Sequence, residues 1–258
     1  MSTLLRAATL TNFEQVALEC GLDALALVKE MGLSPRCLTE PDLRLPAIGV
    51  GELLELAAQR AHEPSFGLRM AASRRLSNLG PLGMLLREQP TLRHALESLV
   101  TYLHTHAEAL SVSLVEKGDL VSIREELIIE GGVQPPQAIE MSMCTTFRVL
   151  QIFLGERWQP RLVAFRHPEP ENTQTHQHLF GSRIAFSQEF NEIVCNASDL
   201  AAPNLGADPV MAQYSKRLLE QEVGINANMS ERVRRLIVVL LPRGHCRVET
   251  VARQLGVD

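Results

Sequence analysis

Histidine pairs occur at two places in the chain, and neither pair has the spacing of a metal site. His104 and His106 close one apolar helical pattern, and His176 and His178 fall within a shorter one. Residues i and i+2 of an α-helix lie about 200° apart, so the two rings of each pair face different sides. We therefore expect no metal, and we expect no other cofactor. A ligand cavity lined by one histidine of the first pair stays open, and His104 is our candidate.

Cys144 lies between opposite charges on a second candidate surface. Residues 135–155 repeat with a helical period, and Glu140, Cys144 and Arg148 are each four residues apart on one helix face. A thiolate beside a cation can be reactive. However, no histidine base is adjacent in the sequence, and we find no nucleotide-binding glycine-rich loop, nucleophile elbow or metal motif. We expect no catalytic residues and no enzyme, and a thiol-dependent enzyme is the least favoured alternative.

The C-terminal end has the pattern of a DNA-binding motif. Four apolar residues form one face of a short helix: Val248, Val251, Ala252 and Leu255. Gly256 suits the left-handed turn that ends a helix, and Asp258 suits the cap of a second helix. This is the first half of a helix-turn-helix, without the recognition helix. We expect Arg247, Arg253 and Asp258 to mark the start of a DNA-binding domain in a truncated chain, or in the ordered part of a longer one.

Charge is distributed unevenly along the chain. Residues 230–258 contain six arginines and three acidic residues, a local charge of +3, and the total charge of −5 then leaves −8 on residues 1–229. Proteins that bind DNA neutralise phosphates with Lys and Arg. The sequence therefore predicts an acidic body joined to a basic reader of DNA.

Composition excludes several classes of protein. The chain has 258 residues, of which 45% are hydrophobic, so it is long enough to bury a sizeable core. It has no apolar run of about 18 residues and no apolar N-terminal signal segment, so we expect no membrane contact and a cytoplasmic location. The five cysteines are odd in number and widely spaced, which favours reduced thiols over disulfides.

Apolar periodicity predicts an α+β fold. Helical patterns cover residues 12–20, 23–31, 50–61, 66–72, 84–88, 91–103, 135–155, 175–180 and 209–223. Alternation predicts a hairpin from 110–115 and 120–125, a strand over 162–167, and a second hairpin through 184–186 and 193–195. Residues 41–46 suggest a linker-like turn. We expect an N-terminal helical layer, an antiparallel sheet of about five strands packed with helices, and the start of an all-α helix-turn-helix domain.

Several segments, in a fixed order, resemble one protein family. They read GLDALALVKEMGLSPRCLTEPDLRLP from Gly21, EPSFGL from Glu63, LGPLG from Leu79, PTLRHAL from Pro90, and HLFGSRIAFSQEFNEIVCNASDLAAPNLGADP from His178. With the C-terminal half-motif they cover nearly the whole chain. The sequence resembles the AraC/XylS family of bacterial transcriptional regulators, in a subgroup similar to regulators of amino-acid catabolism and virulence.

The resemblance implies a regulator with two functional parts. In this family an N-terminal domain senses a small molecule or forms a dimer, and a C-terminal domain of two helix-turn-helix units binds DNA. We expect an effector-binding domain over residues 1–207, a linker helix and linker over 208–228, and the start of the DNA-binding domain over 229–258. The expected partners are promoter DNA, through the missing C-terminal part, a second copy of the chain, and an effector among amino acids, polyamines or fatty acids.

Candidate site residues follow from residue type and placement alone. His104, Arg148, Arg166 and His167 are our candidates for the polar wall of an effector pocket. For a dimer interface the candidates are Val210, Tyr214 and Leu218 on the helix expected over 209–223, with packing inside the same chain as the competing interpretation. A dimerisation module without any ligand is the alternative function.

Overall fold

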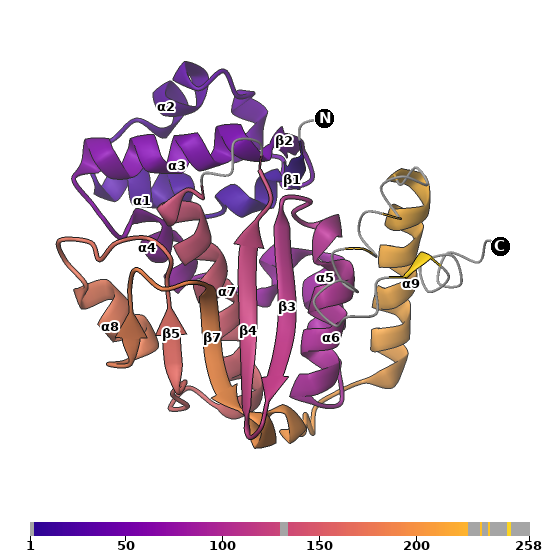
Figure 1. The fold of residues 1–258 in the computed structure, drawn as a ribbon. Coiled ribbons are helices and arrows are strands. Elements are labelled where there is room, and N and C mark those ends of the chain that lie inside the picture. Colours follow the sequence, from indigo (N-terminus) through magenta and orange to yellow (C-terminus); the bar gives the residue numbers. More distant parts are fainter. Residues whose placement is uncertain (1–2, 130–133, 227–232, 234–236, 238–246, 249–258) are drawn as a thin grey trace.

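The computed structural model describes residues 3–129, 134–226, 233, 237 and 247–248. A five-stranded sheet forms the middle of the molecule, helices cover one of its faces, and a layer of N-terminal helices lies across one end (Figure 1). The predicted α+β class is confirmed. Among the described residues, no helix is both long and apolar enough to cross a bilayer.

The N-terminal layer contains the expected helices and one small sheet that the sequence analysis missed. The helices are α1 (Phe13–Glu19), α2 (Ala24–Glu30), α3 (Ala47–Ala61) and α4 (Phe66–Ala72). Strand β1 (Leu4–Arg6) pairs antiparallel with β2 (Arg44–Pro46). The prediction of a linker-like turn over residues 41–46 is therefore wrong for the last three, because their backbone finds its partner in a segment far away in the sequence.

Two helices and a hairpin follow. Helix α5 spans Pro81–Arg87, and α6 spans Leu92–Tyr102, where the Thr91 side chain accepts a hydrogen bond from the backbone N–H of His94 as a helix cap. Strands β3 (Leu110–Lys117) and β4 (Leu120–Leu127) pair antiparallel, and Gly118 supplies a positive φ of 59° in the turn between them. The predicted hairpin is confirmed, and Arg124 of β4 pairs across to Glu192 at 2.9 Å.

The sheet order is β3-β4-β7-β5-β6, with β5 at Leu162–Ala164, β6 at Ile184–Ala185 and β7 at Asn191–Asn196. The predicted second hairpin is wrong, because β6 and β7 are not neighbours and β5 lies between them. Helix α8 (Gln174–Phe180) connects β5 to β6 as a crossover, which makes that pair parallel, whereas the other pairs in the sheet are antiparallel.

Helix α7 (Pro136–Leu154) lies along one face of the sheet and also supports the N-terminal layer (Figure 1). Gly67 of α4 lets the two helices approach closely, because a Cβ there would stand 2.1 Å from the backbone oxygen of Gln137. The Gly67 N–H donates to Oε1 of Gln137 at 2.8 Å, and Nε2 of Gln137 donates to the Pro64 oxygen at 2.9 Å. One buried side chain thus joins α7 to the start of α4.

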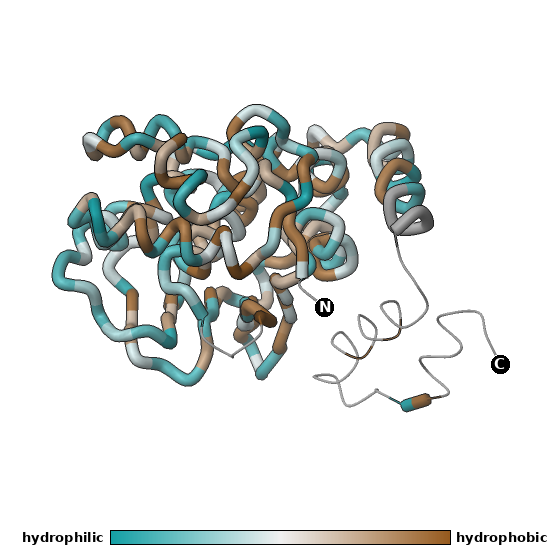
Figure 2. Tube along the Cα trace, turned by 90° about the horizontal axis from the view of Figure 1, so that it is seen from above, coloured by the Kyte–Doolittle hydropathy of each residue, from teal (hydrophilic) through white to brown (hydrophobic). Residues whose placement is uncertain are grey.

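Helix α9 (Pro209–Asn226) lies at the edge of the body, with apolar and polar segments alternating along it (Figure 2). It continues past the expected end at Val223. Ser215 and Leu219 are buried where the helix packs against α5, whereas Val210 and Tyr214 are exposed and Leu218 is half-buried. Within the predicted DNA-binding segment, Arg247 and Val248 are exposed, and Arg253 and Asp258 lie outside the described residues.

Candidate functional site

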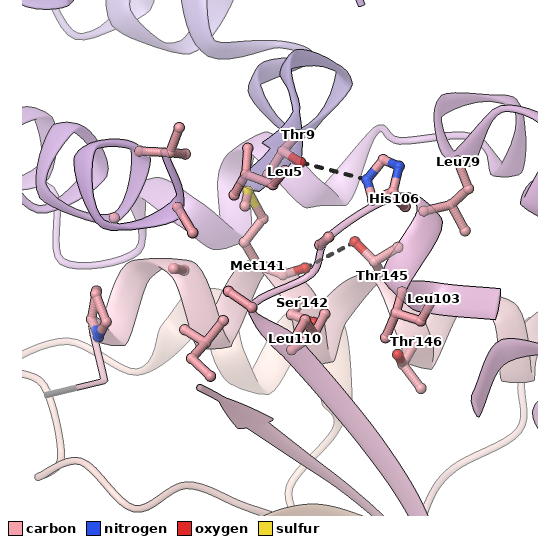
Figure 3. A pocket seen from close by; sticks show the side chains of 18 of the residues that line it. Leu5, Thr9, Leu79, Leu103, His106, Leu110, Met141, Ser142, Thr145 and Thr146 are labelled. Atoms are coloured by element: carbon pink, nitrogen blue, oxygen red, sulfur yellow. Dashed lines mark hydrogen bonds between the residues drawn. The ribbon is translucent and has the colours of Figure 1, made fainter. Parts of the chain in front are cut away.

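A cavity of about 80 Å³ lies where the N-terminal layer meets α7 and the near end of the β3–β4 hairpin. Its wall is mostly apolar, with Leu5, Val50, Leu103, Leu110 and Met141 among the lining side chains (Figure 3). These residues come from five separate elements, so the cavity exists only in the folded chain. A mostly apolar pocket with a few polar groups is the usual form of a small-molecule site.

Arg74 is the one arginine in the wall of this cavity. It follows α4 and is 8% exposed. Its Nη2 donates to the backbone oxygen of Thr9 and, at 3.3 Å, to that of Thr11. Its Nε has no hydrogen-bond partner, and no carboxylate among the described residues pairs with it. Burial lowers the pKa of Arg74 to about 10, so the guanidinium is still a cation at neutral pH.

His106 lies in the same wall, just after the short 3₁₀ helix Leu103–Thr105. Its Nε2 is 3.5 Å from Oγ1 of Thr9, and its buried Nδ1 has no hydrogen-bond partner among the described residues (Figure 3). Burial, with the nearby cations of Arg6, Arg74 and Arg44, lowers the pKa of His106 to about 3. The ring is therefore neutral, and this end of the cavity is positive because of the arginines.

The α7 side of the cavity is lined by the hydroxyl groups of Ser142, Thr145 and Thr146. Thr145 donates to the Met141 oxygen at 2.9 Å (Figure 3), and Ser142 donates to Oε2 of Glu125, a buried residue of β4. Burial raises the pKa of Glu125 to about 7, although hydrogen bonds from Ser142 and Thr146 favour its carboxylate form. The Glu125 carboxyl group contacts the Ser142 hydroxyl but is not part of the cavity wall, and it does not pair with Arg74.

None of the four effector candidates from the sequence lines this cavity. His104 is half-buried in the same 3₁₀ helix as Leu103, and the neighbouring His106 occupies the wall instead. Arg148 lines a neighbouring surface pocket with His178, and the walls of that pocket and of the cavity share Arg74 and Thr145. Arg166 is exposed, 3.8 Å from Glu126. His167 joins a buried cluster near α8. Helical periodicity could not show which of His104 and His106 lines the cavity, because helix α6 ends at Tyr102 and both histidines lie beyond its end.

That buried cluster consists of Glu140, His167 and His176. Nε2 of His176 lies 2.7 Å, and Nε2 of His167 3.3 Å, from Oε1 of Glu140. Phe165 and Phe186 contact both rings. The described residues contain no group of three ligating side chains arranged to hold a metal. The cluster is therefore a buried polar contact among α7, α8 and the end of β5, and sequence spacing gives no sign of it.

Cys144 is fully buried on α7. Burial raises the pKa of its thiol to about 12, although Arg148 and Arg74 act in the opposite direction. The thiol stays protonated at neutral pH, so the suggestion of a reactive thiolate beside Arg148 is wrong. The charged neighbours in the sequence did not indicate the pKa of Cys144, because desolvation by burial has the largest effect on that pKa.

Comparison with known proteins agrees with this architecture. Residues 21–204 match the model of the N-terminal arabinose-binding domain of AraC transcription regulators. The helix-turn-helix-type transcriptional regulator VirS of Mycobacterium tuberculosis is 28% identical over 260 aligned residues, covering 100% of this chain and 76% of VirS.

A crystal structure of the transcriptional regulator CdpR from Pseudomonas aeruginosa has the same fold, with a TM-score of 0.55 and 18% identity over 90% of this chain and 73% of CdpR. The family match covers all of α2 to β7 and most of the cavity wall. The chain belongs to the AraC family of transcriptional regulators and carries that family's N-terminal arabinose-binding domain.

Proposed function

We propose that this chain is the effector-sensing part of a DNA-binding transcriptional regulator, and that the effector binds in the cavity between the N-terminal layer and α7. The observation that carries the proposal is a mostly apolar cavity whose wall includes a buried cation and a buried imidazole with unused hydrogen-bonding atoms. Such atoms are costly to bury without a partner. A ligand that supplies the partner would bind preferentially to the folded body.

The cavity is placed to convert binding into a change of shape. Its wall combines residues of β1, α3, α6 and α7. A ligand that contacts all of them favours the arrangement in which they close around it. A ligand shifts a conformational equilibrium only by its difference in affinity for the two states. The proposed output is a change in promoter binding through the segment that begins near residue 229.

Thermal unfolding of the chain with amino acids, polyamines, fatty acids and small aromatic acids tests sensing. We expect a saturable rise in Tm with one class, because a ligand that binds only the folded state stabilises it by mass action. Ala138→Leu, which fills the cavity, should abolish the rise. Ala201→Leu, at an exposed position, is the matched control and should keep it. A panel without any effect would overturn the proposed sensing role.

A homodimer through α9 is the second part of the proposal. Val210 and Tyr214 are 73% and 55% exposed and lie four residues apart, on one face of the helix. Large apolar side chains on a shared exposed face favour association with another surface. Sedimentation of wild type and Tyr214→Asp measures this directly: we expect a dimer that the substitution dissociates. A wild-type monomer at high concentration would contradict the dimer, without affecting the sensing proposal.

A further inference from the structure

The cavity wall contains a cation without a counter-ion. Arg74 is more than nine-tenths buried, and the acceptors of its guanidinium are two backbone oxygens, of Thr9 and Thr11. Glu140 differs, because its Oε1 lies within 3.3 Å of two histidine nitrogens. A buried cation is expensive unless an anion accompanies it. Arg74 therefore points to a negative charge that the described residues do not supply.

Two further groups indicate the form of that charge. His106 lies in the wall with Arg74, and the nearby Arg44 has a buried Nη1 without a hydrogen-bond partner among the described residues. The cations of Arg6, Arg74 and Arg44 all act on His106. Asp42 pairs with Arg6, so of these three cations Arg74 and Arg44 are left without a carboxylate among the described residues. The neutral imidazole can donate one hydrogen bond, and Nε of Arg74 can donate another. Two donors beside these two cations fit the two oxygens of one carboxylate.

The remaining wall sets the rest of the ligand. Leu5, Leu99, Leu103, Leu110 and Val149 surround the space beside Arg74, and the polar exceptions are hydroxyl groups. The volume is about 80 Å³. A dry cavity of about 150 Å³ in another protein accepts benzene, so the smaller space here excludes an aromatic ring and leaves room only for a short aliphatic body. A long alkyl chain would not fit, and a polyamine would meet the arginines with like charge.

Resting on the proposed sensing function, we infer that the effector is a small monocarboxylate with a compact apolar body, such as a short branched aliphatic acid, whose carboxylate binds Arg74 and His106. This inference names the class of effector that the proposed function leaves open. It assigns Arg74 to recognition of the charge and the leucine wall to recognition of the apolar body.

Titration calorimetry and thermal unfolding with matched probes test the inference. We expect isobutyrate and isovalerate to bind the wild-type chain saturably, and isobutylamine, isobutanol, benzoate and palmitate to bind at least tenfold more weakly. Arg74→Met should weaken isobutyrate binding at least tenfold and should reduce the preference for isobutyrate over isobutanol to less than threefold. Arg183→Met, at an exposed arginine that lines neither this cavity nor the neighbouring surface pocket, is the matched control and should keep both values.

The outcomes separate this inference from the proposed function. Binding of the amine or the alcohol that Ala138→Leu abolishes would overturn the carboxylate assignment and keep the sensing role, and binding of benzoate or palmitate would overturn the compact aliphatic body. Equal isobutyrate affinity in wild type and Arg74→Met would also overturn the assignment, even with both variants folded. If no probe binds, and a crystal structure shows only water on Nε of Arg74, both proposals fail.

Discussion

Helix α7 separates two groups of buried polar side chains that satisfy charge in opposite ways. On one side, Glu140 has two histidine partners from α8 and the end of β5. On the other, Arg74 faces a cavity with no carboxylate partner among the described residues. The difference separates structure from function: a buried charge paired within the chain stabilises the fold, whereas an unpaired one is available to a ligand.

The largest expected effect is the difference in stability loss between a substitution at Glu140 and one at Arg74. Glu140→Ala should lower the free energy of unfolding by about 3 kcal/mol, because it leaves the fully buried His176 imidazole without its acceptor. Arg74→Met should change it by only about 1 kcal/mol, since the lost hydrogen bonds are offset by removal of a desolvated cation. Urea unfolding of both variants measures the difference. Equal losses would make Arg74 a structural residue like Glu140.

Glu125 is a third buried ionisable group, and its hydrogen-bond partners are hydroxyl groups instead of charged or imidazole side chains. Burial raises its pKa from 4.5 to about 7, so between these values the folded state holds a proton that the unfolded state has lost. Its contribution to stability is complete below pH 4.5 and is lost as the pH rises to about 7.

We expect Glu125→Gln to remove this pH-dependent loss of stability. Between pH 4.5 and pH 8, the free energy of unfolding of the variant should rise by about 3 kcal/mol relative to that of the wild type. Urea unfolding across this pH range measures the gain. A gain that does not depend on pH would show that Glu125 has an ordinary pKa, and would remove the contrast with Glu140.

A smaller effect concerns the contact that brings Arg74 to α7. Gly67→Ala places a Cβ against the Gln137 backbone oxygen, so α4 must move away, at a cost of about 2 kcal/mol in stability. Gly206→Ala, where the nearest atom is 3.7 Å away, is the control and should be nearly neutral. Thermal unfolding compares them. A neutral Gly67→Ala would mean that the approach of α4 to α7 is adjustable.

The smallest effect compares two thiols that lie near arginines. Cys20 is half-buried, 3.3 Å from Nη1 of Arg69, whereas Cys144 is fully buried with a pKa of about 12. In a Cys246→Ser background, a thiol reagent should label the native chain at Cys20 first and leave Cys144 unlabelled until unfolding. Mass spectrometry of the labelled chain locates the sites. Rapid labelling of native Cys144 would revive the thiolate interpretation.

Most elements were predictable because each depends on its own residues. The apolar periods of α3, α6 and α7, the Thr91 cap of α6 and the turn at Gly118 are local signals, and each of these elements forms within three residues of the expected bounds. Errors arose where a partner is distant: β2 pairs with β1, and β5 lies between β6 and β7. Pairing across such separations leaves no period in the sequence.

The sequence by itself determined the family, the α+β class and the chain order of the helices and of the strands in the larger sheet, because motifs and apolar periods are properties of short segments. Only the tertiary structure decided that His106 rather than His104 lines the cavity and that Glu140 has histidine partners. It also decided that Arg74 is buried without a counter-ion. The physical reason is desolvation: the energy of a charged group depends on what surrounds it in space, and those neighbours come from segments far apart in the chain.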